Sequence, residues 1–497
     1  MAKQQIYEIT NGSTLIYQKQ NAFNGYSFTI GFRCGAQMDG KYKGLSHLLE
    51  HLLFRAPDPK STNILMDNIV KYTINQNAFT SKDCIAVTFS CVYKNVEQAL
   101  ANLQTLLTRT KFTASQVAHE LEIVKHEIKM YKDQDAFEQS SALDFFLTNI
   151  ENETESIDIL GNSRTLNSIT PELLSKYVKR YFNLDNLVIS VTTNKSLDSV
   201  LELCNKYIYS ALKRASSPKY IVPLTEPTTF KDVNAFVAVP DEYFQNVSLC
   251  LLLRERSSYA EDINLEYAYD VIEEYLMNDM GGILWDVLRT KNQLTYDYEL
   301  SNLDFGTAKF KAFSVLTNSS KMRKTVRELC NTIRQIGTYG ISKSDFEKIK
   351  KVLTDIKLAT LNKFRSTSAK SNFLDFLAKK PFVDYKKVND YIEKMTYEQF
   401  NEYIMGVYST ANVSFAANGK FDSRKCYSLI EIEKMLGNYS HVEMQADFNA
   451  PKIEFTPLPD PNLDKLNDIA NEYILQKTSQ PKKETKPVIS IDDTPIK

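Results

Sequence analysis

The first part of the chain shows two hydrophobic periodicities. Apolar and polar residues alternate in some stretches, which predicts β-strands, and apolar residues recur every three or four positions in others, which predicts helices. Strands are expected at 6–10, 13–17, 26–33, 77–80, 85–93 and 187–193, with a hairpin turn at Asn11-Gly12. Helices are expected at 44–54, 63–72, 95–109, 114–133, 137–150 and 170–182. This order predicts an α+β domain whose antiparallel strands carry helices on one face.

The same order of elements returns in the second part of the chain. Strands are expected near 234–239, 247–254, 295–303 and 306–315, and helices at 260–277, 320–336 and 343–364. Residues 168–191 also align without gaps to residues 394–417, so that Tyr177 matches Tyr403. Two unrelated helix–strand pairs would not keep one offset over so many positions. We therefore predict two homologous repeats, each an antiparallel sheet with helices packed on one face.

Proline-rich stretches mark the limits of the two repeats. Residues 215–230 contain three prolines and no helical period, which is typical of an extended linker. Seven of the fifteen prolines lie beyond residue 450, where we expect a partly disordered, solubilising tail. The predicted organisation is a first domain at 1–214, a linker at 215–230, a homologous second domain at 231–437 and the tail at 438–497.

One helical stretch of the first domain, Ser46 to Phe54, carries two histidines and an acid in the order H-x-x-E-H. On a helix, His47 and His51 lie on one face at the spacing at which two imidazoles can share a tetrahedral ion such as Zn²⁺. Glu50 lies on the same side, where its carboxylate can take a proton from water. A half-solvated helix face can carry the same residues by chance, so the motif alone leaves both interpretations open.

A second helical stretch, Thr113 to Asp133, carries acids at a matching spacing. Glu120 and Glu127 are two turns apart and share a face. Glu127 is the predicted third ligand of a His₂Glu zinc site, and Glu120 the predicted outer acid that orients a histidine or water. The alternative is an acidic face exposed to solvent. Since the second repeat has no H-x-x-E-H equivalent, we expect one Zn²⁺ per chain, in the first domain.

Composition narrows the classes of partner and compartment. The chain has 497 residues, with 60 basic and 61 acidic side chains, a balance that does not favour nucleic acid or an anionic membrane. Its seven cysteines are scattered, without a C-x-x-C pair, which predicts buried free thiols in a reducing compartment. No apolar run has the length of a membrane span, and the amino terminus lacks a signal or transit pattern. We expect a soluble, cytoplasmic protein.

The chain resembles the pitrilysin or insulinase family of zinc peptidases, close to half-size members such as the β subunit of mitochondrial processing peptidase. The resemblance covers roughly residues 5–420 and includes the inverted H-x-x-E-H order, the strand that leads into it, and acids at the positions of Glu120 and Glu127. A segment similar to the family's N-A-(Y/F)-T edge strand, on which substrate lies, is formed by Asn77, Ala78, Phe79 and Thr80. The glycine pair that usually precedes this segment is replaced by other residues.

The second domain contributes an independent match. Residues 289–296, RTKNQLTY, resemble the family's R-x6-Y segment, in which Arg289 and Tyr296 would reach the substrate at the zinc. The glycine-rich loop of the non-catalytic partner subunit is absent, which favours a catalytic, β-like chain.

The sequence thus predicts a zinc endopeptidase for short or unfolded peptides, with Glu50 as general base and with Arg289 and Tyr296 assisting. The resemblance implies that two half-size chains close into a chamber, as a homodimer or as a heterodimer with a homologue. The alternative is a non-catalytic partner or scaffold subunit. Presequence removal, leader-peptide maturation and peptide clearance remain equal choices of substrate.

Overall fold

The structure, a computed structural model, describes most of the chain up to residue 437. The described residues are 4–21, 23–133, 159–226, 229–230, 236–240, 245–255, 262–278, 280–295, 297–305, 308–360, 368–381, 383–410 and 412–437. The predicted tail at 438–497 and the predicted helix at 137–150 lie outside them.

The first half of the chain contains a six-stranded sheet in the order β1-β2-β6-β3-β5-β4. Its strands are β1 (Gln4–Glu8), β2 (Thr14–Lys19), β3 (Tyr26–Phe32), β4 (Ile74–Thr80), β5 (Ile85–Cys91) and β6 (Leu187–Thr193). Its helices are α1 (Leu45–Leu53), α2 (Pro59–Tyr72), α3 (Val96–Leu107), α4 (Ala114–Asp133), α6 (Ser163–Leu166), α7 (Pro171–Tyr181) and α8 (Leu197–Tyr207). The elements predicted on described residues are present, and β1 begins two residues earlier than expected.

The second half contains a five-stranded sheet in the order β7-β11-β8-β10-β9. Its strands are β7 (Phe236–Pro240), β8 (Val247–Arg254), β9 (Asp297–Asp304), β10 (Lys309–Thr317) and β11 (Asn412–Gly419). Its helices are α9 (Ile263–Asn278), the π-helix η6 (Trp285–Lys291), α10 (Met322–Tyr339), α11 (Lys343–Thr360), α12 (Ser368–Leu377), α13 (Tyr385–Lys394), α14 (Tyr397–Thr410) and α15 (Leu429–Leu436). Between the halves, residues 215–226 contain a short 3₁₀ turn, Pro218–Tyr220.

The two sheets have equivalent pairing, which confirms the two repeats. β6 pairs antiparallel with β3 and parallel with β2, while β11 pairs antiparallel with β8 and parallel with β7. Each of these central strands follows the helix that the sequence repeat predicts, α7 before β6 and α14 before β11. The remaining pairs of both sheets are antiparallel. The domain boundaries themselves stay a prediction.

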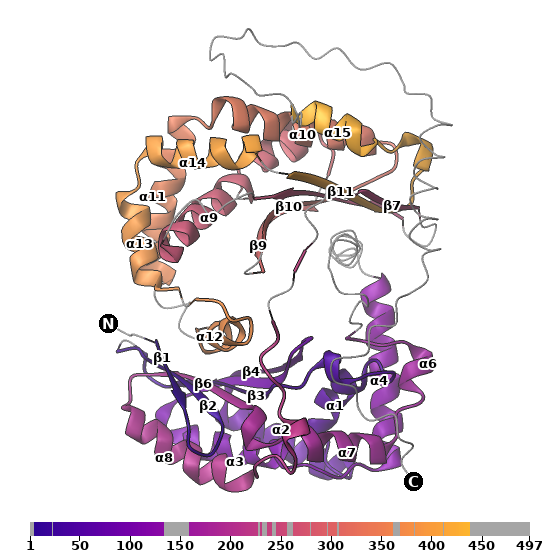
Figure 1. The fold of residues 1–497 in the computed structure, drawn as a ribbon, viewed down its shortest axis with the longest axis vertical. Helices are drawn as coiled ribbons and strands as arrows, with labels where there is room; N and C mark the ends of the chain where they lie inside the picture. The colour runs from indigo at the N-terminus through magenta and orange to yellow at the C-terminus, as the bar shows by residue number, and fades with distance from the viewer. Residues whose placement is uncertain are drawn as a thin grey trace.

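Alternation along the strands buries both faces of the first sheet. In β2, Leu15 and Tyr17 point into the main core with α1, α3 and α7, whereas Ile16 points to the opposite face. That opposite face is covered by α12, which comes from the second half of the chain and contributes Phe373 and Leu377. Figure 1 shows α12 lying on the first sheet, between the two halves. In the same view, α10, α14 and α15 lie on the side of the second sheet that faces away from α12.

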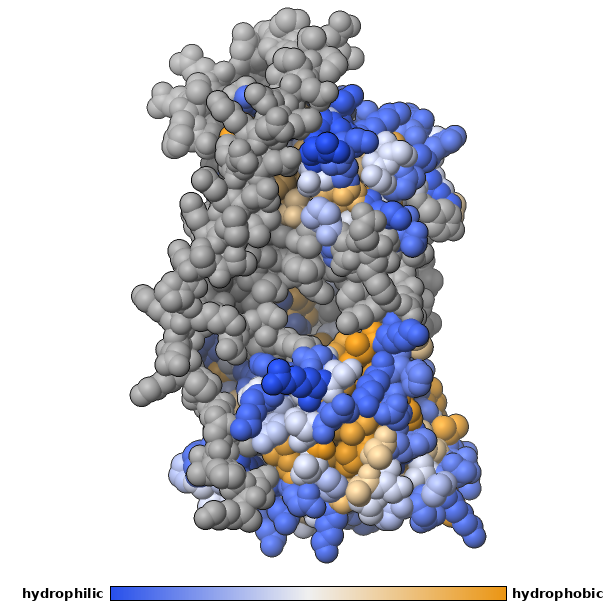
Figure 2. Space-filling view, turned by 90° about the vertical axis from the view of Figure 1, so that its right-hand side faces the viewer, coloured by the Kyte–Doolittle hydropathy of each residue, from blue (hydrophilic) through white to orange (hydrophobic). Residues whose placement is uncertain are grey.

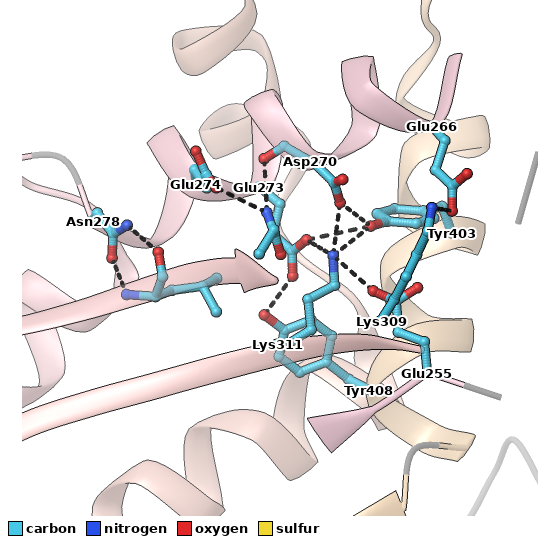
Figure 3. Close-up of polar contacts among 12 residues, drawn as sticks. Glu255, Glu266, Asp270, Glu273, Glu274, Asn278, Lys309, Lys311, Tyr403 and Tyr408 are labelled. Carbon is cyan, nitrogen blue, oxygen red and sulfur yellow. Dashed lines mark hydrogen bonds and ion pairs between the residues drawn. The ribbon is translucent and has the colours of Figure 1, made fainter. Parts of the chain in front are cut away.

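The second half encloses a buried charged cluster (Figure 3). Lys311 of β10 is fully buried, and its Nζ lies 2.6 Å from Glu273 Oε2, 2.8 Å from Asp270 Oδ1 and 3.2 Å from Glu255 Oε1. The hydroxyl of Tyr403 lies 2.9 Å from the same Nζ. Burial alone would lower the pKa of Lys311, but Glu273 and the other charged neighbours raise that pKa well above its ordinary value. Lys311 is therefore charged in the folded protein.

On the face of the molecule drawn in Figure 2, the described surface differs between the halves. In Figure 2, hydrophobic colour gathers on the lower half, which is the first half of the chain, while the visible described surface of the upper half is mainly hydrophilic. The seven cysteines are free thiols, and all but Cys426 are buried. Among the helices that the structure describes, none is both long enough and apolar enough to span a bilayer.

Candidate metal centre

Helix α1 presents the H-x-x-E-H residues because its leucines anchor the opposite side. Leu45, Leu48, Leu49 and Leu52 are fully buried in the core of the first half. This orients His47, Glu50 and His51 toward α4 and the end of β4. The amphipathic pattern of the sequence therefore decides which face of the helix is available for chemistry.

The amino end of α1 is held by a residue outside the helix. Its N-cap position is Gly44, whose positive φ of 90° suits glycine but provides no side-chain cap. Instead, the buried Asp39 carboxylate accepts hydrogen bonds from Gly44 N (3.1 Å), from Ser46 N (3.1 Å) and from the Ser46 hydroxyl. Tyr177 OH of α7 lies 2.9 Å from Ser46 Oγ. These contacts hold the first turn of α1 in place at Ser46, the residue before His47.

Three potential ligand atoms converge between α1 and α4. Glu127 Oε2 lies 3.2 Å from His51 Nε2 and 3.7 Å from His47 Nε2, and the three ligand atoms all lie within 4.8 Å of one another. Zinc bonds to these atoms are about 2.0–2.2 Å long, so tetrahedral ligands lie roughly 3.3–3.6 Å apart. The donor set, two imidazoles and a carboxylate, and its spacing therefore fit Zn²⁺.

Glu120 and Arg55 lie behind the candidate ligands. Glu120 Oε2 is 3.5 Å from His51 Nδ1, on the ring edge away from Glu127, and Glu120 Oε1 is 2.5 Å from Arg55 Nε. A carboxylate at Nδ1 holds the imidazole in the tautomer that offers Nε2 to a metal. The position is the one predicted for Glu120, and its role stays a prediction.

Glu50 lies beside the three converging groups without belonging to them. Its Oε2 accepts a hydrogen bond of 2.9 Å from Thr80 Oγ1, at the end of β4. Burial raises the pKa of Glu50, and the Thr80 hydrogen bond and the charge of His51 oppose part of that rise. A carboxylate with a raised pKa is a stronger proton acceptor, as a general base needs.

The pKa values of the two histidines, His47 and His51, shift in opposite directions. Burial, and then the charge of His51, lower the pKa of His47 to about 4. Burial would also lower the pKa of His51, but hydrogen bonding to Glu120 and the charges of Glu127 and Glu50 raise it overall. His47 is therefore neutral at physiological pH, which is the form that coordinates a metal.

The remaining predicted site residues lie in β4, in the second half of the chain, or outside the described residues. Asn77, Ala78, Phe79 and Thr80 form the end of β4, which is an edge strand as expected. Arg289 lies in η6 of the second half, with its guanidinium 4.1 Å from the centre of the Trp285 ring. Tyr296 lies outside the described residues. The structure thus brings together the residues from α1, α4 and β4.

Sequence reasoning missed Asp39, Arg55 and the contact of Thr80 with Glu50. Arg55 had no helical signal, because it lies two residues beyond the end of α1 at Leu53, and its contact with Glu120 depends on how α4 packs against α1. Asp39 had no such signal either, because the turn residues 40–44 set its distance from α1. Thr80 was expected to bind substrate, and its contact with the general-base candidate depends on how β4 packs on α1.

Asp39 predicts a specific pH dependence of stability. Burial raises the pKa of Asp39 to about 7, although hydrogen bonds from Ser46 and Gly44 oppose the rise. Because this folded-state pKa lies above the unfolded value near 3.8, the folded chain holds the proton more tightly. The stability contributed by this proton is present at low pH and is lost as pH rises from about 4 to about 7.

Asp39→Asn replaces the titrating carboxyl group by an amide that does not titrate, and it removes one hydrogen-bond acceptor at every pH. We expect its melting temperature, relative to the wild type, to increase as pH rises from about 4.5 to 7.5. Thermal melts of both chains across this range test the assignment. A constant difference at all pH values would show that Asp39 is not a buried titrating group.

Comparisons with known proteins find one family in both halves. A sequence model described as "Insulinase (Peptidase family M16)" matches residues 20–159, and one described as "Peptidase M16 inactive domain" matches residues 168–353. An uncharacterized zinc protease of Bacillus subtilis is 24% identical over 386 residues, which cover 74% of this chain and 88% of that protein. A probable mitochondrial-processing peptidase subunit beta of Schizosaccharomyces pombe is 26% identical over 212 residues, covering 42% of this chain and 45% of that protein.

Solved structures agree on the fold. The crystal structure of a protease from Helicobacter pylori superimposes with a TM-score of 0.66 at 15% identity, covering 84% of this chain and 100% of that one. A peptidase M16 inactive domain from Pseudomonas fluorescens gives the same TM-score at 14% identity, with 84% and 98% coverage. The two sequence matches follow one another along the chain: the first lies within the first half, and the second begins with α7 and β6 of the first sheet and extends to residue 353 of the second half. The chain therefore belongs to the insulinase (M16) family of peptidases.

Proposed function

We propose that the protein is a zinc-dependent endopeptidase that hydrolyses short or unfolded peptides. The observation that carries the proposal is the convergence of His47, His51 and Glu127 within 4.8 Å, with the Glu50 carboxylate beside them. Zinc held by these three residues would supply a Lewis acid that polarises the peptide carbonyl and acidifies water. Zinc proteases among the relatives support this choice of metal.

Glu50 is the proposed general base. Thr80 occupies one of its two carboxylate oxygens, which leaves Oε1 to take a proton from the water that attacks the scissile carbonyl. The same oxygen then delivers that proton to the leaving amine. Glu120, itself paired with Arg55, holds the His51 ring in position throughout.

The edge strand β4 is the proposed substrate platform. Among the described strands β4 pairs with β5 alone, so its other side offers backbone groups to which an extended peptide can add as a further strand. Such docking reads the backbone more than the sequence, so it favours unfolded segments. We assign Arg289 and Tyr296 to substrate or oxyanion binding from the second half, following the family's R-x6-Y segment.

A non-catalytic subunit is the second candidate, because the family model that matches 168–353 is described as an inactive domain. Relatives named as a subunit beta imply assembly with a further chain. We propose a homodimer or a heterodimer with a homologue, and a cytoplasmic location stays a prediction.

Metal content and chelator sensitivity decide between the two candidates. We expect about one zinc per purified chain, measured by mass spectrometry of the metal, and peptide cleavage that stops when the zinc is chelated. His51→Ala should lose most of the zinc, whereas His126→Ala should keep it, since His126 is an exposed histidine on α4. A wild-type chain without zinc and without chelator-sensitive cleavage would favour the non-catalytic subunit. Full zinc retention in His51→Ala would remove His51 from the site.

A further inference from the structure

A pocket with a positively charged lining lies along α7, on the first half of the molecule. Its volume is about 610 Å³, within the usual range for small-molecule sites. Lys111, Lys176, Lys179 and Arg180 line it, together with a single acid, Glu172. None of the candidate metal-site residues contributes to its lining, so this pocket is separate from the site described above.

Arg180 is the most informative of these residues because it is buried. Its exposed fraction is 8%, and its guanidinium lies 5.3 Å from the centre of the Tyr220 ring. Within the described part of the chain, no carboxylate lies at ion-pair distance from it. A buried charge without a counter-ion is costly, because the low-dielectric surroundings replace water poorly.

The buried cation of the second half, Lys311, differs from Arg180 in having carboxylate partners. Lys311 is surrounded by Glu255, Asp270 and Glu273, which compensate its charge within the fold (Figure 3). Among the described side chains, the partner of the Arg180 guanidinium is the face of the Tyr220 ring, a weaker cation–π partner. Within the described part of the chain, the charge of this buried cation is therefore left to be compensated from outside, and a pocket lies at that point.

Two lysines of the pocket lining, Lys176 and Lys179, add positive charge on the same helix as Arg180. Lys179 and Arg180 follow Lys176 by three and four residues on α7, so Lys176 lies beside both of them and like charges repel there. None of the three lysines has a carboxylate partner within 4 Å among the described residues. Counting Glu172, the lining carries a net charge of about +3 at neutral pH. A single carboxylate would neutralise only part of this, whereas a pyrophosphate group carries a matching charge.

We propose that this pocket binds the pyrophosphate group of a small phosphorylated ligand. The planar guanidinium of Arg180 offers parallel donors to two phosphate oxygens, and Lys176 and Lys179 act as point charges beside it. The rings of Phe112 and Tyr220 also line the pocket and offer apolar surface to an organic substituent. Inorganic pyrophosphate and nucleoside diphosphates share this chemistry.

Calorimetric titration of the full-length chain tests the proposal, with inorganic pyrophosphate and ADP as separate probes. We expect saturable binding of one pyrophosphate per chain, which weakens as ionic strength rises. Tighter binding of ADP would assign the aromatic side to an organic group, and equal binding would assign the site to the phosphates alone. Absence of saturable binding for both probes would overturn the proposal.

Substitutions test whether pyrophosphate binds in this pocket. Arg180→Gln should weaken pyrophosphate binding at least about tenfold, because a charge-assisted pair of hydrogen bonds is lost. Should that variant fail to fold, the double variant Lys176→Gln/Lys179→Gln, which changes no fully buried side chain, should give a similar loss. The matched control Lys60→Gln, an exposed lysine on α2, should bind as the wild type does.

Pyrophosphate can also bind zinc, so the metal site needs its own control. His51→Ala should bind pyrophosphate as tightly as the wild type, because the pocket along α7 is intact in it. Loss of binding in His51→Ala, with Arg180→Gln unaffected, would place the ligand at the metal and contradict the proposal.

Discussion

Replacement of Glu50 by Gln is expected to lower the rate of peptide cleavage at least about a hundredfold while zinc stays bound. Gln has the size and helix propensity of Glu, and its oxygen can still accept the hydrogen bond from Thr80. It cannot take a proton from water. Because Glu50 is not one of the three converging groups, the metal content should not change. Kinetics on a defined peptide and metal analysis of the same preparation measure both effects.

Glu122→Gln provides the matched control, since Glu122 is an exposed acid on α4 whose described partner is Lys125. It should cleave at the wild-type rate. Binding of the peptide to Glu50→Gln should persist, which separates a loss of chemistry from a loss of affinity. If Glu50→Gln cleaves within a few-fold of the wild type, another group is the base.

Lys311→Met is expected to destabilise the second half by about 3–5 kcal/mol, since it leaves buried carboxylates without their cation. Met keeps most of the side-chain volume, so the loss reports on charge more than on packing. Glu273, which is fully buried, also accepts a 2.7 Å hydrogen bond from Tyr408, but this neutral donor cannot replace the ammonium. Thermal and urea denaturation measure the change.

Lys309→Met is the comparison, because Lys309 lies two residues earlier on β10 and pairs with Glu266 at the cluster's more exposed edge. Its effect should be clearly smaller. Burial raises the pKa of Glu255, so acid neutralises that carboxylate readily, and the deficit of Lys311→Met should shrink as pH falls toward 5. Equal destabilisation by the two variants would show that the cluster does not depend on Lys311.

Local spacing explains which parts of the site could be predicted. His47 and His51 share a helix face by geometry, and Glu120 and Glu127 do so on α4, so each pair follows from its own helix. The family pattern, and not the residues alone, indicated that these helices meet. The alignment of residues 168–191 with residues 394–417 likewise predicted the two-repeat fold, because each segment forms a helix followed by a strand.

Long-range packing explains what could not be predicted. Lys311 lies in a strand, and lysine is usually exposed, so nothing in its local sequence indicates burial against α9. The helix α12 had no predicted counterpart, and its place on the first sheet depends on a connection more than 150 residues long. Arg289 resembles a family position, yet its contact with Trp285 could not be read from the motif.

The place of α12 has a consequence for synthesis on the ribosome. β6, which completes the first sheet, ends at Thr193, and α12 ends at Leu377, 184 residues later. At roughly 5–20 residues per second, the ribosome needs about 10–40 s to make this stretch. Until then the sheet face that contains Ile16, Ala86 and Val188 lacks its cover. We therefore expect nascent chains arrested before residue 368 to be held by chaperones, and chains arrested well beyond residue 377 to be released from them.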